Sequence, residues 1–139
     1  DITSHTTRAE LARSFVEGPL LSLLSGRDNL RGCGVELDSR ITAVGGGSRS
    51  PATRQLLADL SGEEVVTLDV EEATARGACV QAAAVAAGAD TGGLVDLAKR
   101  WQPAVRATAV PRRTGRDVPA LRARWAAVAE SPLIDGAGS

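Results

Sequence analysis

Three consecutive glycines follow a short apolar run, and two small polar residues come soon after them: Gly45, Gly46, Gly47, Ser48 and Ser50. Backbone without side chains allows a ligand to lie directly against the chain, and the amides that open the following helix offer donors and a partial positive charge. Nucleotides are the usual ligands of such a loop. A tight strand-to-helix turn that needs unusual dihedral angles explains the glycines equally well, so both interpretations stay open.

Two common nucleotide motifs can be compared with this spacing. A Rossmann fingerprint asks for G-x-G-x-x-G and an acid at the end of the next strand. Gly45, Gly47 and Asp69 match that pattern, but Ser50 stands where the third glycine belongs. A phosphate loop of the G-x-x-x-x-G-K-[ST] kind is excluded, because Lys99 is the only lysine and lies far along the chain.

Cysteine and histidine offer little chemistry elsewhere. Cys33 and Cys79 lack a CxxC spacing, and His5 alone cannot complete a Cys/His metal site, so we predict no metal ligands. A Ser/His/Asp triad would have to use His5 near the terminus, which we do not expect. We expect both thiols to be reduced, with Cys79 a small apolar filler.

Composition limits the class of protein. The chain has 139 residues, 43% of them hydrophobic, which suits one globular domain, and its net charge of -1 favours neither nucleic acid nor a membrane as partner. Arg112, Arg113 and Arg116 have no aromatic neighbours, which favours a solvated loop. Since no apolar run reaches the roughly 20 residues of a membrane helix and the start lacks a secretory signal, we expect a cytoplasmic protein.

The loop sits inside a pattern typical of a βαβ unit. Residues 40–44 predict a strand, Ser50 and Pro51 are typical of a helix start, and residues 51–60 have an amphipathic helical period. Gly62 suits the end of that helix, and the β-branched run 64–70 predicts a second strand. The two strands should therefore be parallel, with the helix crossing between them.

Helices are expected on both sides of this unit. Their expected ranges are 7–24 with a kink or break near Pro19, 72–88 as a buried, closely packed Ala-rich helix, 94–101 and 118–130. Residues 25–34 and 103–117 are expected to be a loop and a surface connection, and 132–139 a flexible tail. Trp101 and Trp125 are expected to anchor the C-terminal helices.

Three blocks of the sequence, in order and spacing, resemble the C-terminal domain of FGGY-family carbohydrate kinases, nearest the xylulokinases. They are "TTRAELARSFVEG", "ITAVGGGSRSPATRQLLADLSGEEV" and "EEATARGACVQAAAVAAG", which together span residues 6–88. The resemblance implies an α/β fold that is part of the second lobe of an actin-like ATPase (ribonuclease H-like) fold, a βαβ unit with packed helices.

The same resemblance implies a site and a reaction. ATP with Mg²⁺ would lie in a cleft between two lobes and phosphorylate a sugar, most similarly D-xylulose to xylulose 5-phosphate. Gly45, Gly46 and Gly47 would lie against the adenosine and α-phosphate side of ATP, with Ser50 and, less directly, Ser48 adding contacts. The block that contains Gly77 and Ala78 would pack closely behind the nucleotide.

The resemblance also implies what this chain does not contain. In the family the first lobe, the sugar contacts, the general base and most Mg²⁺ ligands lie upstream, so we expect residues 1–131 to be an N-terminally truncated domain, inactive alone. Asp59 and Asp69 match non-catalytic family positions, so no catalytic residue is predicted. Expected partners are ATP, the sugar, and the N-terminal lobe or a partner chain, with a homodimer possible. The alternatives are a Rossmann-like dinucleotide-binding domain and a non-catalytic interaction module of the same fold.

Overall fold

A long N-terminal helix leads into a small sheet, and further helices follow. The structure, a computed structural model, describes residues 2–113 and 115–129, and the predicted tail at 132–139 lies outside them. The elements are α1 (Arg8–Gly32), β1 (Arg40–Ala43), the 3₁₀ turn η1 (Gly46–Arg49), α2 (Pro51–Ser61), β2 (Glu64–Leu68), α3 (Ala73–Ala86), α4 (Thr91–Arg100), β3 (Val105–Ala109) and α5 (Val118–Ala129).

The sheet has the strand order β1-β2-β3. β1 and β2 are parallel, with Ile41 opposite Val65, and α2 lies between them in sequence, so the predicted βαβ unit is confirmed. The prediction of a surface connection over residues 103–117 is wrong, because β3 pairs antiparallel with β2 and places Ala109 opposite Val65. The missed signal is the alternation of small and polar residues in β3, between two prolines.

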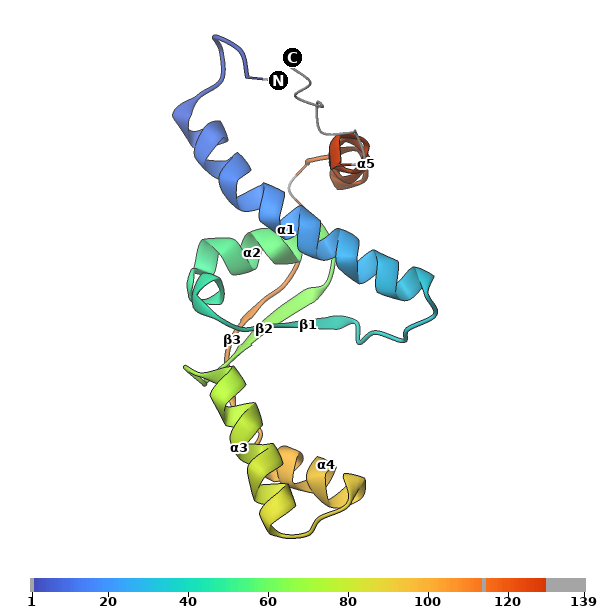
Figure 1. Ribbon diagram of the computed structural model, residues 1–139. Helices are drawn as coiled ribbons and strands as arrows, with labels where there is room; N and C mark the ends of the chain where they lie inside the picture. The colour runs from blue at the N-terminus through green and yellow to red at the C-terminus, as the bar shows by residue number, and fades with distance from the viewer. Residues whose placement is uncertain (1, 114, 130–139) are drawn as a thin grey trace, which may run out of the picture.

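The core lies between the sheet and two helices that cover one of its faces, α1 and α2 (Figure 1). Alternate strand residues point to the same face, so Ile41, Val65 and Ala109 meet the helices together. Helix α5 lies beside α1 and packs Trp125 against this core. The buried hydrophobic cluster is Leu20, Leu21, Leu24, Leu57, Ala58, Leu60, Val65 and Ala109.

Helix α1 is longer than predicted. It runs from Arg8 to Gly32 through Pro19, so the expected break is absent, and the loop expected at 25–34 is largely helical. Pro19 is exposed, whereas Leu20, Leu21 and Leu24 after it are buried in the core. On the other side of the proline, Glu17 is held by an ion pair with Arg116. Tertiary packing here outweighs the cost of a helix-interior proline.

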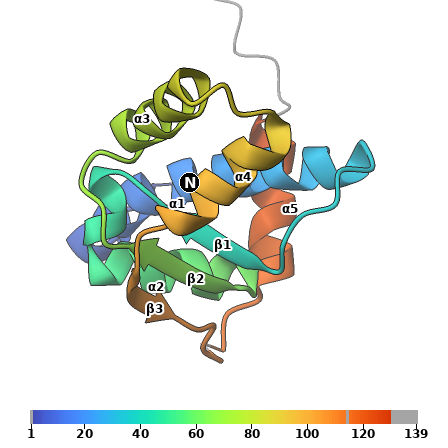
Figure 2. The same ribbon diagram turned by 90° about the horizontal axis from the view of Figure 1, so that it is seen from below.

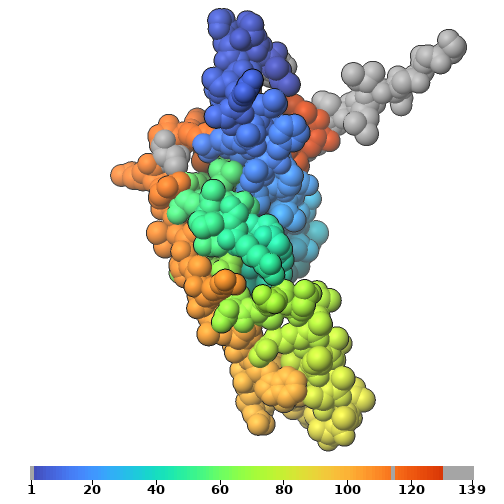
Figure 3. All heavy atoms as spheres, turned by 90° about the vertical axis from the view of Figure 1, so that its left-hand side faces the viewer, coloured from blue at the N-terminus to red at the C-terminus, as the bar shows by residue number. Residues whose placement is uncertain are grey.

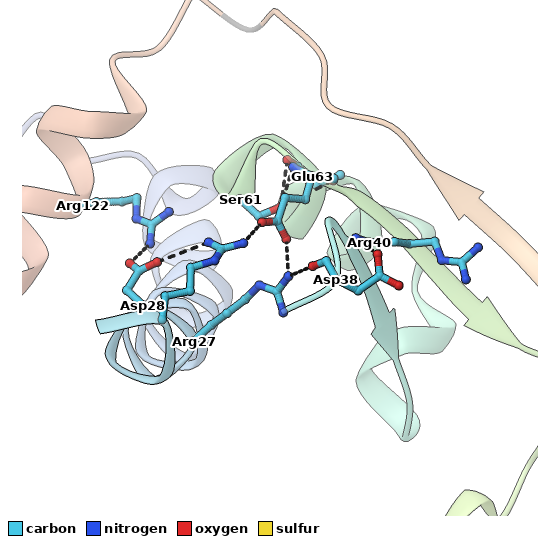
Figure 4. A network of polar contacts seen from close by, with 9 residues as sticks. Arg27, Asp28, Asp38, Arg40, Ser61, Glu63 and Arg122 are labelled. Atoms are coloured by element: carbon cyan, nitrogen blue, oxygen red, sulfur yellow. Dashed lines mark hydrogen bonds and ion pairs between the residues drawn. The ribbon is translucent and has the colours of Figure 1, made fainter. Parts of the chain in front are cut away.

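Charged side chains hold the C-terminal third of α1, as Figure 4 shows. Arg27 pairs with Glu63 at 2.8 Å between Nη2 and Oε2, and its guanidinium also donates to the Asp38 carbonyl. Asp28 pairs with Arg122 of α5. The Arg27 contacts join α1 to the turns that precede β1 and β2, and the Asp28 pair joins it to α5. Together they explain why a glycine-containing, polar stretch is helix rather than loop.

Helices α3 and α4, joined by a short loop (Figure 2), form a hairpin that stands apart from the rest of the chain (Figures 1 and 3). The prediction of a buried, closely packed α3 is wrong, because Ala84 is its only buried residue. A Cβ at Gly77 would meet nothing within 4 Å, and Cys79 is exposed rather than an apolar filler. Both cysteines are free, as expected.

Candidate functional site

The glycine loop, residues 45–50, connects the end of β1 to the start of α2. Gly45 has φ 91° and ψ 179°, and residues Gly46–Arg49 then form the turn η1. The amide of Ser48 donates to the Gly45 carbonyl at 3.2 Å, and the Ser48 hydroxyl donates to the same oxygen at 2.7 Å. The Ser48 side chain therefore stabilises the turn from within.

Only one of the three glycines is required by the turn itself. Gly45 has a positive φ, which other residues rarely adopt, whereas Gly46 and Gly47 do not. A Cβ at any of the three would meet no atom within 4 Å. Neither the dihedral angles nor the packing of this chain therefore explains glycine at 46 and 47, and the backbone there is open to a molecule from outside.

Ser50 begins helix α2 as predicted. Its side-chain oxygen accepts a hydrogen bond from the Thr53 amide at 3.3 Å, and Pro51 occupies the first turn. This is an N-cap, which satisfies one of the free amides at the start of a helix. The remaining amides and the helix dipole give this end of α2 a partial positive charge.

A crevice of about 280 Å³ lies beside the glycine loop, at the carboxyl ends of β1 and β2. In open α/β sheets this edge is where ligands bind. Val44, Gly45 and Ser48 form part of its wall. Its charged lining is three arginines against one carboxylate: Arg49, Arg54, Arg106 and Glu71. The excess positive charge suits an anionic ligand.

Arg54 and Arg106 were not among the predicted site residues. Arg106 lies in β3, the strand that the sequence analysis missed. Arg54 carried a usable signal, since a cation near the start of a helix opposes the helix dipole and therefore suggests a specific partner. Ser50, predicted as a ligand contact, has its hydroxyl engaged in the helix cap, and its contact with a ligand stays a prediction.

Asp59 and Asp69, the first two aspartates that follow the loop in sequence, are not part of the crevice lining. Asp59 accepts hydrogen bonds from Gln55 at 2.9 Å and from the Arg112 amide and guanidinium at 2.9 and 2.8 Å. Burial acts to raise the pKa of Asp59, but the bonds from Arg112 and Gln55 outweigh it and lower that pKa. Asp59 is thus a carboxylate that anchors the segment after β3 to α2.

The prediction that Arg112, Arg113 and Arg116 lie in a solvated loop is also partly wrong. Arg112 pairs with Asp59, and Arg116 pairs with Glu17 of α1, whose Oε1 also accepts from Arg13 Nε at 2.5 Å. Burial acts to raise the pKa of Glu17, but the hydrogen bonds from Arg116 and Arg13 lower it overall. The two arginines therefore connect the segment between β3 and α5 to the helices.

Within residues 2–113 and 115–129, no three His, Cys, Asp or Glu side chains gather closely enough to hold a metal ion. In the same part of the chain, no helix is both long and apolar enough to cross a lipid bilayer.

Known proteins resemble this chain in sequence and in fold. The xylulose kinase of Haemophilus influenzae is 40% identical over 80 residues, and that of Escherichia coli 45% over 56 residues, which is 58% and 40% of this chain. The matched segments are 16% and 11% of those two kinases, so the chain spans less than a fifth of their length.

A solved structure shares the fold. Plasmodium falciparum glycerol kinase, in a crystal structure with ADP, matches with a TM-score of 0.71 at 21% identity, over 96% of this chain and 26% of that one. The chain is accordingly part of the second lobe of an actin-like ATPase fold. The Rossmann-like alternative is wrong, and the antiparallel β3 also departs from its parallel sheet.

A match over the region that contains the glycine loop shows the family of this chain. Residues 1–87, which run from the start of the chain to the end of α3, match the model for the C-terminal domain of the FGGY family of carbohydrate kinases. This match includes the glycine loop, both parallel strands and α2. The chain therefore belongs to the FGGY family of carbohydrate kinases, as part of their C-terminal domain.

Proposed function

We propose that this chain binds the nucleotide in an ATP-dependent sugar kinase whose acceptor is D-xylulose. One observation supports the nucleotide most directly: Gly46 and Gly47 leave open backbone that neither the turn nor the packing requires. Family membership supports the kinase, and the xylulose kinases among the relatives support the choice of sugar.

The proposed roles are assigned to the open backbone of Gly46 and Gly47, which is not part of the crevice lining, and to the arginines that are. ATP supplies the phosphoryl group that is transferred. The backbone of Gly46 and Gly47 lies against the adenosine and α-phosphate side of the nucleotide, where a larger side chain would collide with it. Arg49 and Arg106 of the crevice offset phosphate charge, and the partial positive charge at the start of α2 acts in the same direction.

Other parts of the proposed reaction lie outside this chain. Asp59 is tied to Arg112, and no cluster of His, Cys, Asp or Glu in the described residues could hold a metal ion. We propose that an N-terminal lobe or a partner chain supplies the base, the Mg²⁺ ligands and the sugar contacts, and that the 139 residues alone are inactive. A non-catalytic interaction module of the same fold would show no turnover, so phosphorylation of D-xylulose by the longest natural protein that carries this segment separates it from this proposal.

Replacing Gly46 by valine tests the nucleotide contact, in the longest natural protein that carries this segment. The new side chain enters open space in the folded chain, so folding should be preserved. ATP binding should weaken at least about tenfold, roughly 1.4 kcal/mol, with sugar binding unchanged. Calorimetric titration of ATP and of D-xylulose measures both affinities, and a thermal melt checks the fold.

Two further glycine variants serve as controls. Gly26→Val also places a side chain in open space, on α1, and should leave ATP affinity unchanged. Gly45→Ala is strained by its positive φ and should lower both stability and affinity. If folded Gly46→Val bound ATP as tightly as the parent protein, the open backbone at residue 46 would not contact the nucleotide and the proposal would be wrong.

A further inference from the structure

Arg54, in the second turn of α2, reaches back to the glycine loop. Its Nη1 donates hydrogen bonds to the carbonyl oxygens of Ser48, at 2.8 Å, and Arg49, at 3.0 Å. Both carbonyls belong to the second half of the turn η1. One guanidinium nitrogen thus joins two successive peptide groups of the loop to the helix that follows it.

This arrangement is electrostatically unfavourable for the helix alone. A cation near the start of α2 opposes the helix dipole, and Arg54 is half-buried. Among residues 2–113 and 115–129, no carboxylate forms an ion pair with Arg54, whereas Arg112 and Arg116 each have one. The two loop carbonyls are therefore the groups that account for the position of this side chain.

The two bonds restrict the direction of the loop backbone. The described peptide bonds are all trans, so fixing the carbonyls of Ser48 and Arg49 also fixes the opposite direction of the amides that follow them. The amide of Ser50 donates to the Gly47 carbonyl at 3.4 Å, which is long for an N–H···O hydrogen bond. This bond by itself therefore holds the turn weakly. Arg54 therefore contributes much of the order of residues 46–49.

We propose that Arg54 is a positioning residue of the nucleotide site, a role that rests on the function proposed above. It holds residues 46–49 in the turn against which the nucleotide lies, and it acts through the carbonyls of Ser48 and Arg49. Without these bonds the loop would have to be ordered when ATP binds, and part of the binding free energy would be lost to that ordering.

The test compares Arg54→Met and Arg54→Lys in the longest natural protein that carries this segment. Methionine keeps the apolar stem and removes the donors, whereas lysine keeps a charge and donors for the carbonyls. Hydrogen exchange of the peptide covering residues 46–50 reports loop order, and titrations with ATP and with D-xylulose report affinity. Arg124→Met, at an exposed position on α5, is the matched control.

In Arg54→Met, the loop amides should exchange with solvent at least about tenfold faster than in the parent protein. ATP binding should weaken about tenfold, with D-xylulose affinity unchanged. In Arg54→Lys, loop exchange and ATP affinity should stay close to those of the parent protein, and Arg124→Met should change neither. Weaker ATP binding with unchanged loop exchange would mean that Arg54 acts on the ligand directly, and the proposal would be overturned. Faster exchange with unchanged ATP affinity would overturn it as well.

Failure of the proposed function would be visible separately. If the parent protein bound no ATP, the kinase proposal would be wrong, while the exchange of residues 46–50 would still decide whether Arg54 orders the loop. Unchanged exchange in a folded Arg54→Met protein would then overturn the positioning role by itself.

Discussion

The molecule has two ends (Figure 3), and they use apolar residues in different ways. Around the sheet, α1 and α2 bury a continuous cluster in which Leu60 is 2% exposed and Val65 fully buried. In the hairpin of α3 and α4, Ala84 is the only buried residue, and Val85 is 80% exposed. The first end has its own core, and the second has mostly surface.

This difference explains where the candidate site lies. The glycine loop is attached to the end with the core, through β1 on one side and α2 on the other, so its position is fixed by buried neighbours. The hairpin instead forms one side of an open apolar groove of about 480 Å³, lined in part by Val80, Leu94 and Trp101.

The chain contains one tryptophan for each end, which makes the comparison measurable. Trp125 packs against the core, and Trp101 follows α4 and lines the hairpin groove. Trp101→Phe and Trp125→Phe variants each leave one fluorescent reporter. In urea, the Trp101 signal should change at a lower concentration than the Trp125 signal, because the hairpin has less buried surface to stabilise it.

The largest expected effect is the loss of a core side chain. Leu60→Ala removes a buried leucine from α2 and should lower the free energy of unfolding reported by Trp125 by about 3 kcal/mol. Leu94→Ala, at a half-buried position in the hairpin, should lower the stability reported by Trp101 by about 1 kcal/mol. Equal losses at the two positions would contradict the assignment of a core to one end only.

An intermediate effect is expected from the anchor between α2 and the segment after β3. Asp59→Asn removes a charge that accepts bonds from Arg112 and Gln55, and should cost about 1.5 kcal/mol at pH 7. Asp96→Asn, at an exposed position on α4, should change stability by less than about 0.5 kcal/mol. Denaturation at pH 7 measures both variants.

The pH dependence of this anchor has a definite sign. The pKa of Asp59 is lowered in the folded chain, so its contribution is present above the unfolded pKa of about 3.9. It is lost as the pH falls through the folded value. The difference in stability between the parent chain and Asp59→Asn should therefore shrink below about pH 4. A difference that stayed constant down to pH 2 would contradict the pKa direction.

Local patterns predicted the centre of the fold but not its edges. The strand, loop and helix around Gly45 to Gly62 follow from residues that act within a few positions, such as the cap at Ser50 and the positive φ of 73° at Gly62. The continuation of α1 beyond residue 24 depends instead on Glu63 and Arg122, which are distant in sequence. Periodicity cannot indicate such partners.

The site was predicted in the same uneven way. The sequence singled out the three glycines, but only the structure distinguishes Gly45, which the turn needs, from Gly46 and Gly47, which it does not. The amphipathic period of residues 51–60 does not single out Arg54, because its bonds to the loop depend on the shape of η1. The Ala-rich composition of α3 indicated close packing that the described residues do not provide.

The smallest expected effects come from the two matched helix caps. Ser50 accepts from the Thr53 amide at the start of α2, and Asp90 accepts from the Gly93 amide at 2.9 Å at the start of α4. Replacing either residue by alanine should cost about 1 kcal/mol, because one free amide loses its acceptor. Ser50→Ala should shift the unfolding reported by Trp125, and Asp90→Ala only that reported by Trp101.

Ser50→Thr and Asp90→Asn keep an acceptor and should restore most of each loss. If Asp90→Ala shifted both signals equally, the hairpin and the core would unfold as one unit, and the division of the molecule into two ends would be a matter of shape rather than of stability.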